Sequence, residues 1–186
     1  MIKNEKKKYD YYYDAMDFLN DGETKTAKKL LQKALKLDGD FIDAYNGLVA
    51  VYEGEGNKKK AKECSELAYS KTRETFPNWP EEMHWGEIDN RQFLRAVCNK
   101  AIYLHEEEKF KEAEELYRLL LKLNPGDNQG VRYLLAALFA GKEPEIVEEL
   151  TDKGNELQDW SEMEELLETQ NKKHKFWNEE TLETKK

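Results

Sequence analysis

Cysteine is scarce in this chain of 186 residues, which contains only Cys64 and Cys98. The two thiols do not lie at the spacing of zinc ligands, and so few cysteines exclude a disulfide-rich secreted scaffold. A chain of this length can bury roughly 70% of the surface that its unfolded form exposes, so it can fold without disulfides or a structural metal. We therefore expect a reduced, intracellular protein.

Long hydrophobic runs are also lacking. The longest apolar run, residues 134–140, is far shorter than the roughly 20 residues that span a bilayer. The basic residues near the start, Lys3 and Lys6 to Lys8, are followed by tyrosines instead of the apolar stretch and cleavage site of a signal peptide. The sequence therefore predicts no membrane span, no secretion and a cytoplasmic location.

The motifs of common enzyme classes are missing as well. The sequence has no Gly-rich phosphate loop, no zinc-ligand spacing and no nucleophile elbow. Cys98 and His105 lie seven residues apart and would share a helix face, and His84 could approach them, but such sets arise often by chance. We therefore predict no enzyme activity, no cofactor and no bound metal.

Charged residues are abundant. They make up 37% of the chain against 39% hydrophobic residues, a balance that would suit a disordered protein, but 10 Tyr, 7 Phe and 4 Trp argue against disorder. An elongated helical array reconciles the two observations, because its large surface needs many charges and its narrow core uses aromatic rings between helices.

A 34-residue spacing organises the first part of the chain. Ala27 and Ala61 are separated by that distance, and the spacing aligns residues 8–41 with residues 42–75. In this pattern, small residues at positions eight and twenty let two helices approach closely, while large residues at positions four, eleven and twenty-four fill the space beside them. The alternative is an ordinary helical bundle that happens to place alanine at this spacing.

Two further copies follow after an interruption. The third copy, residues 94–127, is the cleanest, with Ala101 and Ala113 at positions eight and twenty. A fourth, degenerate copy begins near Asn128, and Pro144 stands where its second helix can open. Because a lone helical hairpin cannot cover its apolar face, the copies are expected to stack.

These positions resemble the tetratricopeptide repeat superfamily over about residues 8–150. The segment 121–135, LKLNPGDNQGVRYLL, is more specific. It is similar to a phrase of uncharacterised bacterial and archaeal repeat proteins and of the suppressor of tumorigenicity seven family, in which an aromatic and acidic insertion like residues 85–91 precedes it. The resemblance implies an all-α fold, a right-handed superhelical stack of antiparallel helical hairpins, that binds proteins or peptides in a concave groove lined by the first helix of each hairpin.

The repeat register divides the chain into five parts. They are a basic N-terminal extension (1–7), two tetratricopeptide-like repeats (8–75), a Trp- and Pro-rich insertion (76–93), a third repeat with a degenerate fourth (94–160), and a capping helix with a frayed tail (161–186). We expect Trp79 and Trp85 to anchor the insertion to the helical array rather than to meet a ligand.

The resemblance also implies which side chains line the groove. In this superfamily, positions two, five, six, nine, twelve and thirteen of each first helix face the concave side. The predicted groove residues are Tyr9, Tyr12, Tyr13, Met16, Asn46, Arg95, Asn99, His105, Arg132 and Tyr133, beside Asn20, Asp43, Glu53, Cys98, Glu106, Gln129 and Phe139. Because Tyr and Arg are enriched at energetic hot spots, this mixture predicts a peptide-binding surface. Two alternatives stay open: the tyrosines only wedge neighbouring helices, or the insertion fills the groove.

Charge distribution bears on the partner. Residues 143–170 contain 11 Asp or Glu and one Lys, a balance that repels nucleic acid and anionic membranes. A solvated outer face on a capping helix is the alternative explanation of this acidity. We therefore expect neither a nucleic-acid partner nor a membrane.

Two arginines predict a positive strip in the groove. Arg95, Arg132 and Tyr133 fall on the first helices of neighbouring hairpins, where they could hold an extended, acidic segment of a partner. The competing possibility is that Glu106, Asp89 or the acidic segment of residues 143–170 already neutralises these arginines.

The sequence therefore predicts a non-catalytic protein–protein interaction module. Its expected partner is a protein or an extended peptide. The alternative is a structural subunit that assembles into a homo-oligomer through the exposed end of the helical stack.

Overall fold

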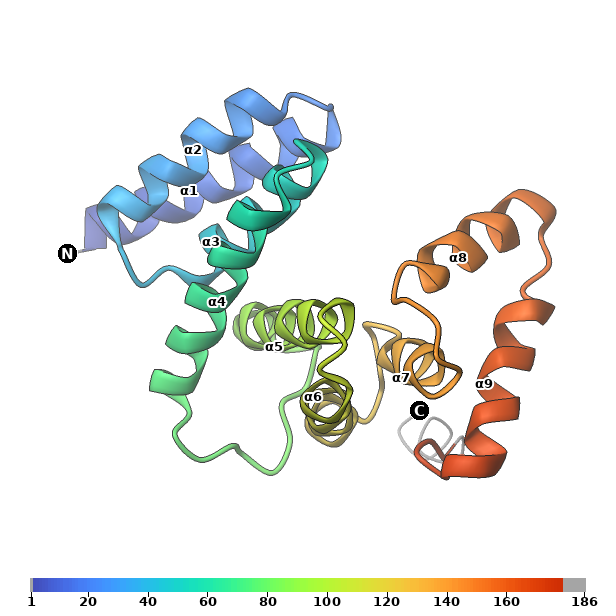
Figure 1. The fold of residues 1–186 in the computed structure, drawn as a ribbon. Coiled ribbons are helices and arrows are strands. Elements are labelled where there is room, and N and C mark those ends of the chain that lie inside the picture. Colours follow the sequence, from blue (N-terminus) through green and yellow to red (C-terminus); the bar gives the residue numbers. More distant parts are fainter. Residues whose placement is uncertain (1, 179–186) are drawn as a thin grey trace. The chain divides into compact units, whose positions relative to one another are not determined.

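The structure, a computed structural model, describes residues 2–178 of the chain, with side chains from Glu5 onward. Within that range the backbone forms nine helices and no strand, which confirms the predicted all-α fold (Figure 1). The helices are α1 (Ile2–Asn20), α2 (Thr24–Leu37), α3 (Ile42–Gly54), α4 (Lys58–Thr75), α5 (Ile88–Glu106), α6 (Phe110–Leu123), α7 (Val131–Phe139), α8 (Ile146–Leu157) and α9 (Ser161–His174). Residues 179–186 of the predicted tail lie outside the described residues.

The helices divide between two compact units. Unit 1, residues 1–78, holds α1 to α4, and unit 2, residues 79–186, holds α5 to α9. The pairs α1/α2 and α3/α4 in unit 1 and α5/α6 in unit 2 form hairpins, the building block of a helical-repeat solenoid. The boundary between the units falls inside the predicted insertion of residues 76–93.

Unit 1 consists of the hairpins α1/α2 and α3/α4, with α2 also packed on α3. On α2, Ala27, Leu31 and Ala34 recur at helical spacing and are fully buried, which gives the helix one apolar face. Gly22 and Gly56 supply the positive φ of the two hairpin turns. These turns separate the paired helices where the repeat register expects them.

The first helix is longer than the sequence predicted. Helix α1 begins at Ile2, so it takes in most of the expected N-terminal extension of residues 1–7. The physical reason is that lysine is a good helix former and that neither glycine nor proline interrupts the chain before Gly22.

Gly47 marks a close approach of α3 to the first hairpin. A Cβ atom at this position would lie 2.9 Å from Leu31 Cδ2 and 3.0 Å from Met16 Cε. The tight contact is thus at position six of the second copy, whereas position eight holds Val49. Glycine is required here by packing, since there is no room for a side chain unless its neighbours move.

Unit 2 begins with the hairpin α5/α6, the third predicted copy. Ala101 on α5 and Ala113 on α6 are fully buried, as are Tyr117 and Leu120 one and two turns beyond Ala113. Small residues at the crossing leave room for the Tyr117 ring to enter the core. The positions of both alanines agree with the repeat register.

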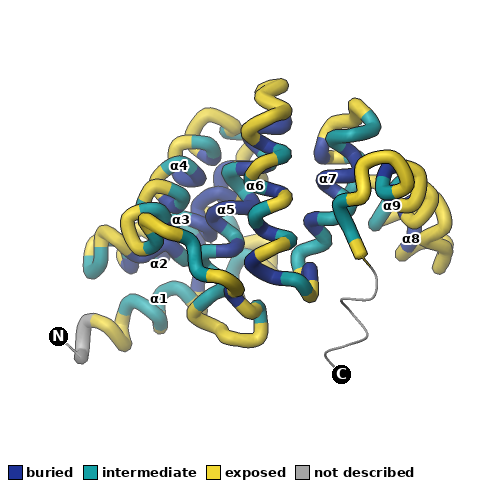
Figure 2. Tube along the Cα trace, turned by 90° about the horizontal axis from the view of Figure 1, so that it is seen from below, coloured by how far each residue is buried: buried dark blue, intermediate teal, exposed yellow. Residues whose placement is uncertain are grey.

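Helix α7 is covered differently from the prediction. The sequence predicts a hairpin of α7 with α8, but α7 packs mainly on α6 and α9, and α8 contacts it less. Helix α9 supplies the cover through the buried side chains Met163, Leu167 and Gln170. In α8 only Gly154 is buried, so the helix is exposed along most of its length (Figure 2).

The segment between α4 and α5 is shorter than predicted and is docked on unit 2. Helix α5 begins at Ile88, so residues 88–93 of the expected insertion are helical. The Met83 side chain is buried, and its N–H donates to the carbonyl oxygen of Leu123 at 2.5 Å. The Arg91 Nε donates to the Trp85 carbonyl at 2.9 Å. The Trp85 carbonyl is thus bonded to α5, and the buried side chain of this segment is Met83, which sequence reasoning missed. The anchoring role of Trp79 and Trp85 stays a prediction.

Candidate functional site

Three tyrosines of α1 gather around the buried ring of Phe41. Tyr9 and Tyr12 meet Phe41 edge to face, with ring centroids 5.0 and 5.7 Å away. Tyr13 lies at the outer side of this cluster, 6.4 Å from Tyr9 and 5.4 Å from Tyr12 between ring centroids, and it is 56% exposed. Such geometries are attractive for aromatic rings. Tyr9 and Tyr12 thus wedge α1 against the start of α3, while Tyr13 presents its ring to solvent.

A lysine closes one side of this aromatic cluster. The Lys8 Nζ lies 2.6 Å from Asp38 Oδ2, 5.2 Å from the Tyr9 centroid and 5.1 Å from the Phe41 centroid. Burial acts to lower the pKa of Lys8, but the hydrogen bond and the charge of Asp38 outweigh it and raise that pKa. The charge of Lys8 is therefore paired within the cluster. The part of the cluster that is exposed to solvent is aromatic.

Two further groove residues predicted in unit 1, Asn46 and Met16, contact neighbouring helices. Asn46 on α3 is buried. The Met16 methyl group fills the space beside Gly47. Asn46 therefore does not form the open surface that the repeat register predicts, whereas Met16 is half-buried.

On α5 the predicted groove residues have different surroundings. The Arg95 guanidinium lies 5.3 Å from the Trp85 ring centroid, and Asn99 is half-buried. His105 is 1% exposed, with Nδ1 3.4 Å from the Tyr117 hydroxyl. Burial lowers the pKa of His105 and favours the neutral ring. The prediction that His105 lines an open groove is therefore wrong, because its side chain lies in the core beside α6.

Arg132 is held by a buried carboxylate at the start of α7. The Asp127 side chain accepts hydrogen bonds from the Val131 N–H at 2.7 Å, from the Arg132 N–H at 3.1 Å and from the Arg132 Nη1 at 2.8 Å. Burial raises the pKa of Asp127, and these donors oppose that rise. Asp127 thus caps α7 and binds the arginine at once. Sequence reasoning missed this role, because Asp127 lies three residues before the N-cap position, which Gly130 occupies.

The network continues from α7 to α9. The Arg132 Nη2 donates to the Tyr133 hydroxyl at 3.1 Å, which donates to Glu164 Oε1 at 2.7 Å. The Arg132 guanidinium also lies 5.2 Å from the Trp177 ring centroid. The predicted positive strip is therefore wrong at Arg132 and Tyr133, because both side chains join parts of unit 2. Asp127 thus pairs with Arg132, while Glu164 of the acidic segment accepts a hydrogen bond from Tyr133 and not from an arginine.

The α5/α6 hairpin combines buried alanines at its crossing with the repeat register of the third copy. Residues 94–127 match the family model of the tetratricopeptide repeat. The matched range has the boundaries predicted for the third copy. No curated protein and no solved structure matches the chain. The narrower similarity to the suppressor of tumorigenicity seven family therefore stays a prediction.

Both cysteines of the chain are buried. Burial raises the pKa of Cys64 to about 11 and that of Cys98 to about 12, so both thiols are protonated at neutral pH. Residues 2–178 contain no group of three or more His, Cys, Asp or Glu that could hold a metal ion. None of the described helices is long and apolar enough to cross a membrane.

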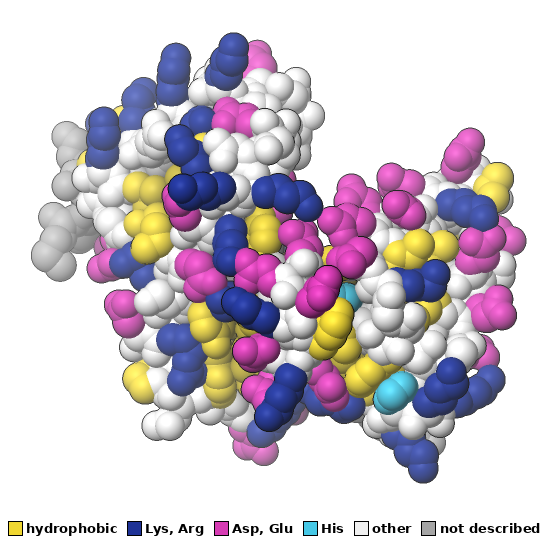
Figure 3. Space-filling view, in the orientation of Figure 1, with side chains coloured by type: hydrophobic (Ala, Val, Ile, Leu, Met, Phe, Trp, Pro, Cys, Tyr) yellow, Lys and Arg dark blue, Asp and Glu magenta, His cyan; other side chains and the backbone are white. Residues whose placement is uncertain are grey.

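Acidic side chains gather over α8 in unit 2 (Figure 3). The exposed carboxylates of this element and the turn before it are Glu143, Glu145, Glu148, Glu149, Asp152 and Glu156. Their exposure agrees with a solvated outer face, the alternative explanation of the acidic segment.

Proposed function

We propose that the chain is a non-catalytic interaction module in which the exposed aromatic face of α1 binds an extended segment of a partner protein. The observation that carries the proposal is the Tyr13 ring, which is solvent-exposed and supported by the packed rings of Tyr9 and Tyr12. A ring held in this way offers contact area at low entropic cost. The tetratricopeptide repeat match at residues 94–127 supports an interaction role.

The α1 face favours a partner segment with apolar or aromatic side chains. Lys8 is paired with Asp38, so no strong positive charge is directed at a ligand there. In unit 2, Arg95 and Asn99 hold the corresponding positions of α5, and we propose them as further contact residues. The partner need not be acidic at these positions, because the arginine expected to select carboxylates, Arg132, is already paired.

A site-specific photocrosslinker tests this proposal. Benzoylphenylalanine placed at Tyr13 is expected to capture a partner in cells of the source organism, while the same group at Leu67 is not. Leu67 on α4 is the matched control, since it is a large apolar residue of the same unit that is 46% exposed. The purified partner should then bind Tyr13→Ala at least about tenfold more weakly than the parent chain. Equal capture at both positions would contradict the proposal.

Self-association is the second candidate function, favoured by α8. Leu157 and Trp160 are large apolar residues that are 59% and 40% exposed, and little of α8 is covered. Such a surface can serve as an isologous interface in a homodimer. Sedimentation at several protein concentrations distinguishes the two functions. A mass that rises with concentration in the parent chain and not in Leu157→Glu would support self-association.

A further inference from the structure

Helix α2 carries a row of lysines on the side opposite its buried face. All four are exposed, and each lies three or four residues after the one before it: Lys25, Lys29, Lys33 and Lys36. Because residues three and four apart lie on the same side of a helix, these side chains form one stripe, called here the lysine stripe. Figure 3 shows Lys and Arg side chains in a row along α2. The stripe belongs entirely to unit 1.

The charge of the lysine stripe is not balanced by its surroundings. Helix α2 contains five lysines and no acidic residue. The fifth lysine, Lys28, pairs with Glu55 at 2.7 Å, whereas the four stripe lysines have no ion pair within the described residues. Lys33 lies 5.5 Å from the Tyr11 ring centroid, a contact that leaves its positive charge in place. Since like charges three and four residues apart weaken a helix, an anionic partner would stabilise this surface.

Helix α8 and the residue before it carry a matching row of carboxylates. They are exposed and recur at the same intervals of three and four residues: Glu145, Glu149, Asp152 and Glu156. This row, called here the acidic stripe, belongs to unit 2. Glu149, Asp152 and Glu156 have no ion pair within the part of the chain that the structure describes. The one lysine of α8, Lys153, pairs with Glu162 on α9.

The two stripes have the same length. From Lys25 to Lys36 and from Glu145 to Glu156 the chain advances by equal numbers of residues, which corresponds to about 16 Å along a helix axis. Four charges of one sign can therefore meet four of the other sign when α2 and α8 lie side by side. Such complementarity favours the correct partner and fixes the register of the contact.

Leucines beside the stripes distinguish the two possible orientations. On each helix, two leucines seven residues apart directly follow a stripe residue: Leu30 and Leu37 on α2, and Leu150 and Leu157 on α8. Viewed along each chain, they flank the two stripes on the same side. In an antiparallel pair these flanks lie on one side of the contact, whereas a parallel pair separates them. The antiparallel pair therefore adds apolar contacts to the ion pairs, and Leu157 is 59% exposed and available for them.

We propose that the lysine stripe of one copy binds the acidic stripe of a second copy, with the two helices antiparallel. The resulting ion pairs are Lys25 with Glu156, Lys29 with Asp152, Lys33 with Glu149 and Lys36 with Glu145. Both stripes are exposed in the single chain, so neither must be uncovered first. The inference rests on the second candidate function, self-association, and replaces a contact of α8 with α8 by a contact between two different surfaces. It goes beyond the α1 face, because it does not use Tyr13.

Charge reversal on either stripe tests the pairing, with sedimentation of the full chain at several concentrations as the readout. An ionic strength of about 0.1 M screens charges more than about 10 Å apart but not pairs in contact. The parent chain is expected to gain mass with concentration. Lys29→Glu with Lys33→Glu should weaken this association by at least about tenfold, as should Glu149→Lys with Asp152→Lys.

An equimolar mixture of the two variants should associate again, because each variant keeps the stripe that the other has lost. Recovery in the mixture also shows that both variants are folded. If the parent chain associates and the mixture does not recover, the stripes do not bind each other between copies, and the proposal is wrong.

A matched control separates local pairing from net charge. Lys59→Glu with Lys111→Glu makes the same change in net charge on exposed lysines outside the stripe, and it should weaken association by less than about threefold. The carboxylate variant lowers the net negative charge of the chain, so general repulsion predicts stronger association for it, the opposite of the proposal. Equal losses in the control and in the lysine variant would overturn the proposal.

Other occupants of the lysine stripe have distinct outcomes. A parent chain that stays monomeric up to about 1 mM would overturn self-association and the pairing together. Association that survives Lys29→Glu with Lys33→Glu would keep self-association and overturn the pairing, as an α8-to-α8 contact predicts. If the parent chain stays monomeric but binds phosphatidylserine vesicles, and the lysine variant does not, the stripe binds a membrane surface and the proposal is wrong. Tyr13→Ala should leave the association unchanged, so failure here and failure at the α1 face can be told apart.

Discussion

Gly154 fixes the turn between α8 and α9 because it has no side chain. A Cβ atom at this position would overlap the indole ring of Trp160, so the ring packs directly on the helix backbone. Gly154→Ala should therefore displace Trp160 and lower the free energy of unfolding by about 1–3 kcal/mol, although alanine is the better helix former. Urea denaturation followed by circular dichroism measures the change. Gly54→Ala, where the new methyl group meets no atom within 4 Å, is the control and should not destabilise the chain.

His105 makes the stability of unit 2 depend on pH. Burial lowers its pKa in the folded chain, against the opposing hydrogen bond to the Lys142 backbone and the charges of Glu143 and Glu145. At a pH below about 6.5, the pKa of histidine in the unfolded chain, His105 is protonated in the unfolded chain while its lowered pKa keeps it neutral in the folded chain. The free energy of unfolding therefore falls as the pH falls through that value.

The variant His105→Gln should therefore lose less stability than the parent chain between about pH 7.5 and about pH 5.5, as thermal melts at both values would show. An identical drop in the parent chain and in His105→Gln would mean that His105 is accessible to protons in the folded state.

At the scale of elements, the start of α7 depends on one ion pair. Arg132→Ala would leave the buried Asp127 carboxylate without its cation, and we expect a loss of about 3–5 kcal/mol in the free energy of unfolding. Arg118→Ala removes a partly exposed pair with Glu114 and should cost about 0–1 kcal/mol. Chemical denaturation of both variants provides the comparison. A cost near zero for Arg132→Ala would restore the interpretation of Arg132 as a surface residue.

The sequence predicted single helices better than it predicted which helices pack together. Periodic alanines such as Ala27 and Ala113 identified the hairpins, because a close crossing needs small residues at set intervals. In the fourth copy α7 packs on α9 more than on its predicted partner α8, and Val147 at position twenty, where the other copies have alanine, was the local sign of this difference. A periodic apolar face shows that a helix is covered but not by which element, so the cover by α9 could not be read from the sequence.

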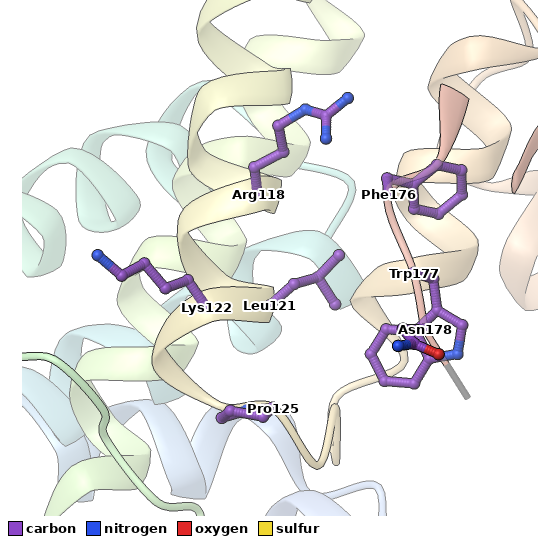
Figure 4. A pocket seen from close by; sticks show the side chains of 7 residues that line it. All are labelled: Arg118, Leu121, Lys122, Pro125, Phe176, Trp177 and Asn178. Atoms are coloured by element: carbon purple, nitrogen blue, oxygen red, sulfur yellow. The ribbon is translucent and has the colours of Figure 1, made fainter. Parts of the chain in front are cut away.

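The same limit applies to predicting the candidate site from the sequence. The register placed Tyr9, Tyr12 and Tyr13 on α1, yet it could not tell a wedge from a contact surface, since that depends on Phe41 in the next hairpin. It also could not find the pocket of about 290 Å³ shown in Figure 4, because that pocket requires α6 and residues after α9 to come together. Both features depend on contacts between segments that are distant in the sequence, so neither could be predicted from local patterns.

At the scale of the whole molecule, two units share one chain, and the segment before α5 belongs to the second. The bond from the Met83 N–H to Leu123 and the buried Met83 side chain predict that this segment is ordered on unit 2. We expect hydrogen exchange at the Met83 amide to be at least about a hundredfold slower than at Glu81, which is exposed two residues earlier. Amide exchange followed by NMR would measure both sites in one sample. Equally fast exchange at the two amides would show instead that residues 79–87 are a free linker between independent units.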